Sequence, residues 1–594
     1  MVPRLSTTTA VLAASLAALS AGALLDRLAP PPAADVALGT EACFGSGLHG
    51  RELPPPARTP QRWTMERAGF RFRDLPSGPV RVLVEVHGQR SPVLVAVEGQ
   101  VVGFIPRDGR SGEWAIAATS GALDVELRAL PFVGWGGRRL GALLDRVVVS
   151  HGPATVPSLA LSLAFLLPAL AVVGAGLAAS LPPLLALCAA MVVSTLQAVA
   201  LAPSGLVRSD YALLLAGLLT AAPVVAWILA RRLGRRQRDA AAWVFVSFLV
   251  VELVQGVAAT SPMMVVSDAE FHANKLAAVA RGEGFPTSIT PGERPFRFPY
   301  GVSFYAILAP LAQAGLGREW LVRSGAAVAG MAASAALLGL LLPWGPRRAA
   351  LATVLLQLLP VTFDLYSFGN LSNVFGQAAT VAFFAWWWAD PPRGRTLVGA
   401  VLLATACLAH FSSLIVLVVV VAALAAVEGG GLAVDRRRSI ALVAGLGIAA
   451  LYYSHFVPLV LDQVRHLTAG SGAARPWGPA LVRQLRSAVE QWGVPAIALG
   501  VLGTLRAGRP SLGRGLIAWA LAGGVLAGAA VLSPVEVRYL YALTLPLVIV
   551  AATGAEWLLG RGPGGVALAA ALLVWQLATA GQGIVEGIVH RYRA

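Results

Sequence analysis

Lysine and cysteine are the two residue types that this 594-residue chain most clearly lacks, since Lys275 is its only lysine and there are three cysteines. Cys43, Cys188 and Cys407 offer no plausible pair on one side of a membrane. This excludes a disulfide framework and a metal site built from thiolates. Charged residues are also scarce, at 13% of the chain.

The net charge of +16 would suggest a nucleic-acid partner if the protein were soluble. Much of this charge, however, is arginine at the ends of apolar runs, where positive residues mark the cytoplasmic side of a membrane. We therefore interpret the charge as a topology signal and expect no nucleic-acid partner.

Apolar runs near the length of a membrane span recur along most of the chain, of which 57% is hydrophobic. Because a bilayer core of about 30 Å needs roughly 20 apolar residues per helix, the pattern predicts a polytopic α-helical membrane protein. Tracing the runs by this length criterion gives about fifteen spans. The arginine-rich and alanine-rich composition favours a bacterial inner membrane, with membrane lipids as the surroundings.

The first predicted span lies within residues 1–29, where Arg4 precedes an apolar stretch from Thr8 to Leu25. It is either an uncleaved signal anchor or a signal peptide that is cleaved near the small residues 20–23. The anchor is favoured, because a protein with many spans does not need the cleavage. Either alternative exports the segment that follows.

Residues 36–152 differ in composition from the apolar runs and predict an exported all-β sandwich. Three stretches alternate apolar and polar side chains or run apolar between Gly, Pro and Ser, namely residues 82–87, 93–99 and 123–127. The tryptophans Trp63, Trp114 and Trp135 have two readings. They either stack on sugar rings, which would make the module carbohydrate-binding, or pack as core or interface aromatics.

Residues 155–232 contain three further apolar runs, and the basic cluster 231–238 follows them. Counting orientation from an N-terminal anchor places this cluster in the cytoplasm, as the charge rule requires. The remainder, residues 238–594, is the main membrane core, and its first outer loop covers residues 260–300.

The outer loop contains an amphipathic pattern over residues 269–280, which predicts a short helix with Phe271 and Leu276 facing lipid. Residues 301–314 are apolar but marginal in length. If they crossed the membrane, the arginines at 347–348 would lie outside, against the charge rule. We therefore predict a second interfacial helix over 301–314.

Three short motifs on the outer side carry a more specific resemblance. They are Asp268-Ala269-Glu270-Phe271-His272, Phe298-Pro299-Tyr300-Gly301, and Arg538-Tyr539-Leu540 with Leu545-Pro546. In their order and common side they resemble the signatures of the glycosyltransferase C superfamily. That superfamily includes the protein O-mannosyltransferases and the lipid A aminoarabinose transferases, which are family 39-like membrane glycosyltransferases. The resemblance covers residues 238–594.

An exported β module between the first two spans also resembles the plan of the mycobacterial arabinosyltransferases, in which that module binds carbohydrate. This chain departs from their pattern, because it has no obvious adjacent Asp-Asp motif and no large exported domain after the core. The likeness is therefore one of architecture.

The superfamily resemblance implies an inverting glycosyltransferase that moves a sugar from a polyprenyl-phosphate donor to a glycan, lipid or protein acceptor. The active site would face the periplasm or exterior. The acceptor hydroxyl needs a general base, and we expect Asp268 in this role with Glu270 in support. The departing phosphate needs positive or hydrogen-bonding groups. The candidates for these are Arg538, Arg294, Arg297 and His410.

Substrate contacts are expected from His272, Tyr300, Asn370 and Asn373, although for His272 an orienting or packing role is favoured. No cofactor is certain. Mg²⁺ or Mn²⁺ would find carboxylates at Asp268, Glu270 and Asp364, but arginine could perform the same electrostatic task.

The Asp268 motif also has a competing structural interpretation. Ser267 and Glu270 have the spacing of an N-capping box, with Ser267 as the cap and Glu270 at the third helical position. In that case the motif would start a helix and need not carry chemistry.

Two other classes of function stay open from the sequence. A transporter or flippase for lipid-linked glycans would also show many spans and intramembrane charge, such as Glu252, but no convincing internal repeat is found. A non-catalytic carbohydrate-binding membrane scaffold would leave the clustered outer Asp, Glu, His and Arg residues unexplained. The transferred sugar and the acceptor are not specified by the sequence.

Overall fold

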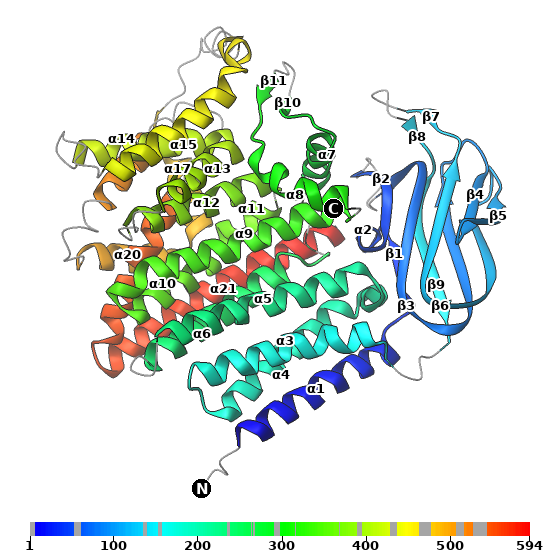
Figure 1. Ribbon diagram of the computed structural model, residues 1–594, viewed down its shortest axis with the longest axis horizontal. Helices are drawn as coiled ribbons and strands as arrows, with labels where there is room; N and C mark the ends of the chain where they lie inside the picture. The colour runs from blue at the N-terminus through cyan, green and yellow to red at the C-terminus, as the bar shows by residue number, and fades with distance from the viewer. Residues whose placement is uncertain are drawn as a thin grey trace. The chain divides into compact units, whose positions relative to one another are not determined.

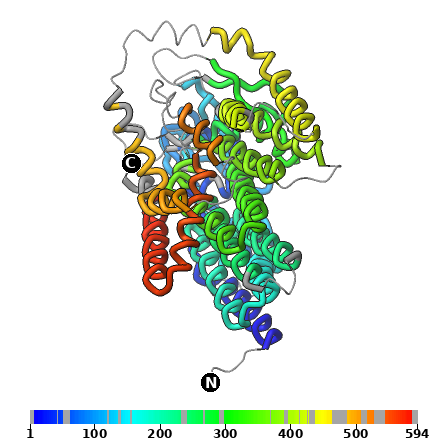
Figure 2. Tube along the Cα trace, turned by 90° about the vertical axis from the view of Figure 1, so that its left-hand side faces the viewer, coloured from blue at the N-terminus to red at the C-terminus, as the bar shows by residue number. Residues whose placement is uncertain are grey.

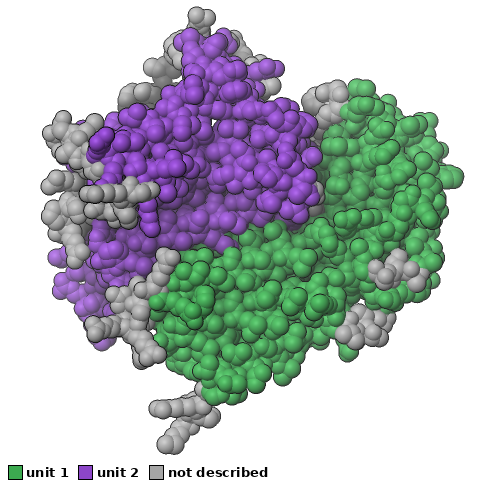
Figure 3. All heavy atoms as spheres, in the orientation of Figure 1, with its two compact units in different colours: residues 1–265, 588–594 green, residues 266–587 purple. Residues whose placement is uncertain are grey.

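The fold is known from a computed structural model of the chain. It describes residues 6–593 apart from positions and segments 38, 53–60, 135–138, 153–156, 234–237, 263, 265, 267, 290–296, 315, 368, 389–394, 428–435, 463–476, 507–515 and 527–542. The chain forms two compact units, unit 1 with residues 1–265 and 588–594, and unit 2 with residues 266–587 (Figure 3). Each unit is described by itself.

The sheet region of unit 1 contains nine strands and one short helix in the described residues (Figure 1). The strands are β1 (Ala33–Asp35), β2 (Gly45–Glu52), β3 (Gln61–His87), β4 (Val93–Val97), β5 (Gln100–Ile105), β6 (Ser111–Ala129), β7 (Phe132–Val133), β8 (Arg139–Leu140) and β9 (Leu143–His151), and the helix is α2 (Glu41–Phe44). Seven strands form one antiparallel sheet in the order β1-β9-β3-β6-β4-β5, with β2 also paired to β3. The predicted stretches 82–87 and 123–127 lie in β3 and β6, and 93–97 of the stretch 93–99 forms β4, so a strand is confirmed at each of them. Glu98 and Gly99 form the turn after β4.

Strand β3 gives the sheet its layered form. Its 27 residues would extend over roughly 90 Å if straight. Instead, Leu143 and Leu144 of β9 pair with both ends of the strand, at Arg62–Trp63 and at Val86–His87. Register shifts between Phe72 and Val80 mark where the strand bends. The predicted sandwich is therefore one continuous sheet that folds back on itself, and not two separate sheets.

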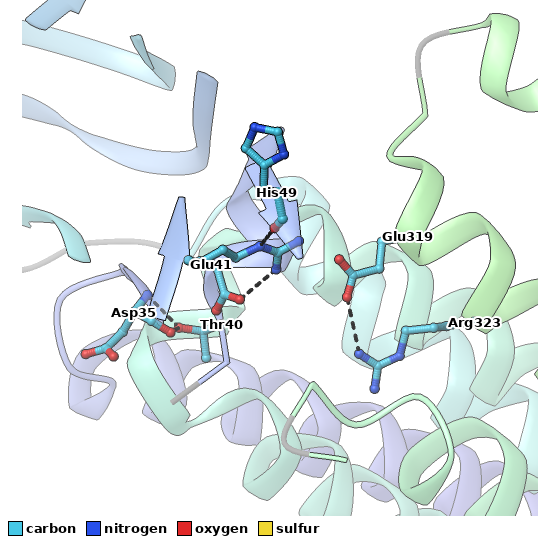
Figure 4. Close-up of polar contacts among 7 residues, drawn as sticks. Asp35, Thr40, Glu41, His49, Glu319 and Arg323 are labelled. Atoms are coloured by element: carbon cyan, nitrogen blue, oxygen red, sulfur yellow. Dashed lines mark hydrogen bonds and ion pairs between the residues drawn. The ribbon is translucent and has the colours of Figure 1, made fainter. Parts of the chain in front are cut away.

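A buried ion pair fixes α2 against β3 (Figure 4). Arg62 donates from its guanidinium to Glu41 at 2.7 Å, and its Nε donates to the carbonyl of His49 at 2.7 Å. Thr40 Oγ1 accepts from the backbone N–H of Asp35 at 3.1 Å. Because buried charges are stable only when paired and hydrogen-bonded, this arrangement holds the first strand to the sheet.

In the part of unit 1 that the structure describes, the helical region contains five α-helices with a 3-10 helix and a π-helix. Figures 1 and 2 show how they are arranged. These are α1 (Thr7–Leu28), α3 (Leu159–Ala178), α4 (Pro183–Leu201), η2 (Pro203–Arg208), α5 (Asp210–Leu233), α6 (Arg238–Val251) and η4 (Glu252–Ala258). Helix α1 buries the small residues Ala10, Ala14, Ala18 and Gly22, which recur every four residues along one face. A Cβ at Gly22 would lie 3.2 Å from Phe165 of α3, so the helices approach closely there.

A second buried ion pair in unit 1 joins the end of α1 to the segment before α5. Arg208 donates to Asp26 at 2.6 Å, and each side chain is 4% exposed. Arg208 also donates to the backbone carbonyl of Asp74 in β3. The predicted anchor helix thus contributes a buried ion pair to unit 1.

Unit 2 is helical apart from one small hairpin in the described residues. Its elements are α7 (Ala269–Ala280), β10 (Thr287–Ile289), β11 (Arg297–Pro299), α8 (Ser303–Gln313), α9 (Arg318–Leu341), η5 (Leu342–Trp344), α10 (Pro346–Leu358), α11 (Pro360–Ser367), α12 (Leu371–Trp388), α13 (Thr396–Ala409), α14 (Phe411–Val427), α15 (Arg436–Ser454), α17 (Trp477–Trp492), α18 (Val494–Thr504), α20 (Thr544–Leu559) and α21 (Pro563–Arg593). Helix α7 has the predicted bounds. Helix α8, at about 16 Å, is too short to cross a bilayer and fits an interfacial helix.

Seven helices among the described residues are long and apolar enough to cross a membrane. They are Thr7–Leu28, Leu159–Ala178, Pro183–Leu201, Asp210–Arg231, Ala240–Ala258, Arg318–Trp344 and Pro563–Ile584. Each matches a predicted span, and the chain has the composition of a membrane protein. Other predicted spans correspond to shorter helices such as α13 and α18. The count of fifteen stays a prediction.

An eighth candidate span is bent, because α10 and α11 meet at 47° before Pro360. Proline cannot donate a backbone hydrogen bond, so the carbonyls before it need other partners. Gln576 of α21, which is fully buried, donates to the carbonyl of Leu358 at 2.9 Å and to that of Trp492 at 3.1 Å. Its side-chain oxygen accepts from the backbone N–H of Ala496 at 3.3 Å. One amide therefore stabilises the bend and the start of α18.

Candidate functional site

Asp268 stands directly before α7 as its N-cap residue, and its side chain is exposed. Its backbone has φ −102° and ψ 15°, and it makes no side-chain cap hydrogen bond to the helix. Ser267, the predicted cap, lies outside the described residues. Because the helix begins at Ala269, Glu270 occupies the second helical position and not the third that a capping box needs. The capping-box interpretation therefore does not fit.

Helix α7 packs into unit 2 more deeply than the sequence predicts. Leu276 and Ala277 are buried, at 0% and 6% exposure, although Leu276 was expected to face lipid. The apolar face of α7 is covered by α8 and α9 instead. This anchors the helix and holds Asp268 at its N-terminal end, where the helix dipole favours a negative charge.

The turn between α11 and α12 lies against Asp268. Gly369 in this turn has φ +70°, and a Cβ at this position would lie 2.5 Å from both the Cβ and the backbone N of Asp268. Only glycine fits both the positive φ and the close approach. The turn is internally bonded, because Asn370 N–H donates to the carbonyl of Leu365 at 2.9 Å.

His272, one turn along α7, is 1% exposed and uses both ring nitrogens within the protein. Nε2 lies 2.5 Å from the carbonyl oxygen of Gly369, and Nδ1 lies 2.6 Å from the hydroxyl of Tyr305. A carbonyl only accepts, so Nε2 carries the proton and Nδ1 accepts from Tyr305. Burial lowers the pKa of His272 to about 4, which keeps the ring neutral. The predicted substrate contact does not fit this geometry.

Tyr300 and Tyr305 extend this buried network. Burial raises the pKa of Tyr305 well above its ordinary value, and Tyr300 and the Asp268 carboxylate add to the rise. The Tyr300 hydroxyl lies 3.3 Å from Ser372 Oγ on α12. Tyr452 of α15 donates to the Tyr300 carbonyl at 2.9 Å. The raised pKa of Tyr305 and the lowered pKa of His272 both favour the uncharged forms of these two groups next to Asp268.

The Phe298–Gly301 motif meets the turn between α13 and α14. Gly301 lies so close to the carbonyl of Ala409 that a Cβ would not fit there. His410, in that turn and 8% exposed, packs edge-on against the Tyr300 ring at 5.7 Å between ring centroids. Two predicted residues from distant parts of the chain are thus in contact.

The remaining predicted residues differ in how far they are buried. Asn373 is buried at 3% exposure on α12, next to Ser372, and Asn370 is half-buried in the Gly369 turn. Glu270 is half-buried, and Arg297 is exposed at the start of β11. Arg294 and Arg538 lie outside the described residues.

Metal ligands were expected, if at all, at Asp268, Glu270 and Asp364. Within the described part of the chain, no group of three or more His, Cys, Asp or Glu side chains is arranged to hold a metal ion. The described carboxylates therefore do not form such a group. No step below depends on a metal.

The two described tryptophans of the sheet region have packing roles. Trp63 packs edge-on against Phe132 at 5.4 Å. Trp114 covers Gly103 and Gly112 so closely that neither could carry a Cβ. Both side chains thus pack against neighbours within the sheet region, although each is only half-buried. Trp135 lies outside the described residues.

Sequence reasoning missed three members of the site: Gly369, Tyr305 and Ser372. Tyr305 lies in an apolar stretch and Ser372 in a helix start, where neither is distinctive. In comparisons with known proteins, neither a family model nor a curated protein matches the chain.

Proposed function

We propose that this chain is an inverting membrane glycosyltransferase, which moves a sugar from a polyprenyl-phosphate donor to an acceptor at the outer face of a bacterial inner membrane. One observation carries the proposal. Asp268 presents an exposed carboxylate at the N-terminal end of α7, without capping the helix, beside a buried and neutral network. A carboxylate in this position can accept a proton.

In the proposed reaction, the acceptor hydroxyl oxygen attacks the anomeric carbon of the donor sugar. The new C–O bond forms as the bond between the sugar and the phosphate oxygen breaks on the opposite face. The hydroxyl proton passes to Asp268, and the polyprenyl phosphate leaves with the bonding electron pair. A positioned general base of this kind contributes about 10²–10⁴-fold to the rate.

The leaving phosphate needs hydrogen-bond donors. Among the described candidates, Arg297 is exposed on β11, and His410 packs on Tyr300 beside the network. Arg294 and Arg538 remain proposals from the sequence. The half-buried Asn370 adjoins the Gly369 turn, which supports a role in sugar contact.

A flippase or transporter for lipid-linked glycans is the second candidate. Two observations favour it. Helix pair α10–α11 is broken by a 47° bend, and broken helices are common in transporters. In addition, Glu252 in π-helix η4 is fully buried, with no hydrogen-bond partner for either carboxylate oxygen in the described residues. Intramembrane carboxyls of this kind often belong to transport pathways. The scaffold alternative is weaker, since Trp63 and Trp114 are packed.

The decisive experiment compares Asp268→Asn with Glu283→Gln in purified protein, supplied with polyprenyl-phosphate sugars and acceptors. Glu283 is an exposed carboxylate in the same loop, paired with Arg281 at 3.1 Å. We expect turnover to fall by about 10²–10⁴-fold in Asp268→Asn, with donor binding retained, because the base alone is lost. The Glu283 variant should transfer normally.

Near-normal transfer by Asp268→Asn would move the base to another residue, Glu270 first. If wild-type protein in vesicles moved the lipid-linked sugar across the bilayer without transferring it, the flippase would replace the transferase.

A further inference from the structure

The imidazole of His272 takes no part in the proposed proton transfer, yet both of its ring nitrogens are hydrogen-bonded next to Asp268. It is buried, and its two nitrogens connect α7 to α8 and to the turn between α11 and α12. A polar group buried at this depth is costly unless every partner is in place. Its contacts therefore have a structural consequence for the site.

We infer that His272 is a positioning residue, which fixes the Asp268 carboxylate by holding the Gly369 turn against it. The inference rests on the proposed function, in which Asp268 is the base. The imidazole itself does not touch the reacting atoms.

The first step of the argument concerns the turn. Nε2 of His272 donates to the carbonyl of Gly369, and the same glycine lies so close to Asp268 that a Cβ added to it would be 2.5 Å from the Cβ and the backbone N of Asp268. That carbonyl also accepts from the backbone N–H of Leu371 at 2.8 Å, a bond within the turn itself. If the bond from His272 were absent, no hydrogen bond among the described residues would tie this carbonyl to α7. The turn could then move away from Asp268 and release its side chain.

The second step concerns the imidazole. The backbone N–H of His272 donates to the backbone carbonyl of Asp268 at 3.0 Å, so both residues belong to the first turn of α7. Tyr305 donates to Nδ1, which selects the tautomer with a proton on Nε2. Tyr305 is itself held in the Tyr300 and Ser372 network, and Ser372 follows Gly369 by three residues on α12. The contacts thus form a closed ring of three elements.

Amide hydrogen exchange tests whether His272 holds the Gly369 turn against Asp268, and this measurement does not depend on enzymatic activity. We would measure it by mass spectrometry in wild type and three variants, His272→Ala, His272→Gln and His455→Ala. Glutamine can donate from its amide nitrogen and accept at its oxygen, so it is the conservative rescue. His455 is an exposed histidine of the same unit and serves as the matched control.

In His272→Ala, exchange should rise at residues 268–273 and 366–374 and stay unchanged elsewhere in unit 2. In the transfer assay, kcat should fall by about 100-fold, the usual cost of a misplacement near 1 Å, while KM for the donor stays within about 2-fold. His272→Gln should recover most of the protection from exchange and most of the kcat, and His455→Ala should match wild type in both.

Unchanged hydrogen exchange in His272→Ala would show that His272 does not hold the Gly369 turn. Raised exchange with unchanged kcat would overturn the positioning role and leave the proposed function intact. If wild type itself transferred no sugar, the proposed function would fail with the positioning role, and the exchange data would still decide whether His272 holds the turn.

Discussion

Unit 1 buries arginine–carboxylate pairs, whereas the groups buried around Asp268 in unit 2 are neutral. Arg208 with Asp26 and Arg62 with Glu41 are closed pairs, each hydrogen-bonded and hidden from solvent. His272 and Tyr305, by contrast, carry no charge, and the charged Asp268 beside them is exposed. A buried ion pair neutralises its own charge and is suited to holding segments together. A neutral network leaves an adjacent carboxylate available for chemistry.

The largest change in the free energy of unfolding should come from breaking a buried ion pair in unit 1. Arg208→Met leaves the Asp26 carboxylate buried without its cation, which should lower the free energy of unfolding by about 3–5 kcal/mol. Denaturant unfolding in detergent would measure it. The double variant Arg208→Met, Asp26→Leu should regain most of the loss. A loss below about 1 kcal/mol in the single variant would contradict a buried pair.

A pH titration should separate the neutral network from the ion pairs. The folded pKa of His272 is about 4, below its unfolded value of about 6.5, so the unfolded state binds more protons between these values. Stability should therefore fall as the pH drops from 7 to 4, by about 3 kcal/mol from this residue. We would compare melting temperatures of wild type and His272→Gln across this range. If the melting temperatures of the two proteins changed in parallel with pH, burial would not lower the pKa of His272.

A smaller effect is expected at Gly369. Gly369→Ala forces a Cβ into the positive-φ region and against Asp268, which should cost about 1–2 kcal/mol or more. The control is Gly339→Ala in α9, where a Cβ would meet nothing within 4 Å and should cause no loss. Equal melting temperatures for the two variants would mean that the turn adapts easily.

The smallest effect belongs to exposed pairs of the sheet. Arg146 binds Glu85 at 2.7 Å, but the two side chains are 44% and 30% exposed, so water screens the pair. Arg146→Ala should lower the free energy of unfolding by about 0–1 kcal/mol. The same unfolding assay checks it. A loss as large as that of Arg208→Met would remove the distinction between buried and exposed pairs.

The local pattern of the sequence predicted the positions of helices and strands well. It predicted poorly which residues pack against one another. Helix α7 has the predicted bounds of residues 269–280, and strands β3, β4 and β6 lie at the predicted stretches, with β4 ending two residues early. Periodicity succeeds here because it depends on each segment alone. Periodicity shows which face of a helix is apolar but not what covers it. For this reason Leu276 was assigned to lipid, although it packs inside the protein.

The candidate site shows the same limit. Asp268, Tyr300 and His410 were identifiable from motifs, but the partner of His272 is a carbonyl 97 residues away. A backbone carbonyl has no sequence signature. Gly369 is one glycine among 63, and its closeness to Asp268 follows only from the tertiary fold.

The amide of Gln576 has a consequence for the order in which the protein is assembled. It satisfies the carbonyl of Leu358 at the α10–α11 bend, 218 residues earlier in the chain. A ribosome adds about 5–20 residues per second, so the bend waits roughly 10–40 seconds for this partner. Until then a chaperone, insertase or transient water must satisfy the exposed backbone. Quality control of this protein would accordingly detect a defect in α21 as a defect in the bend.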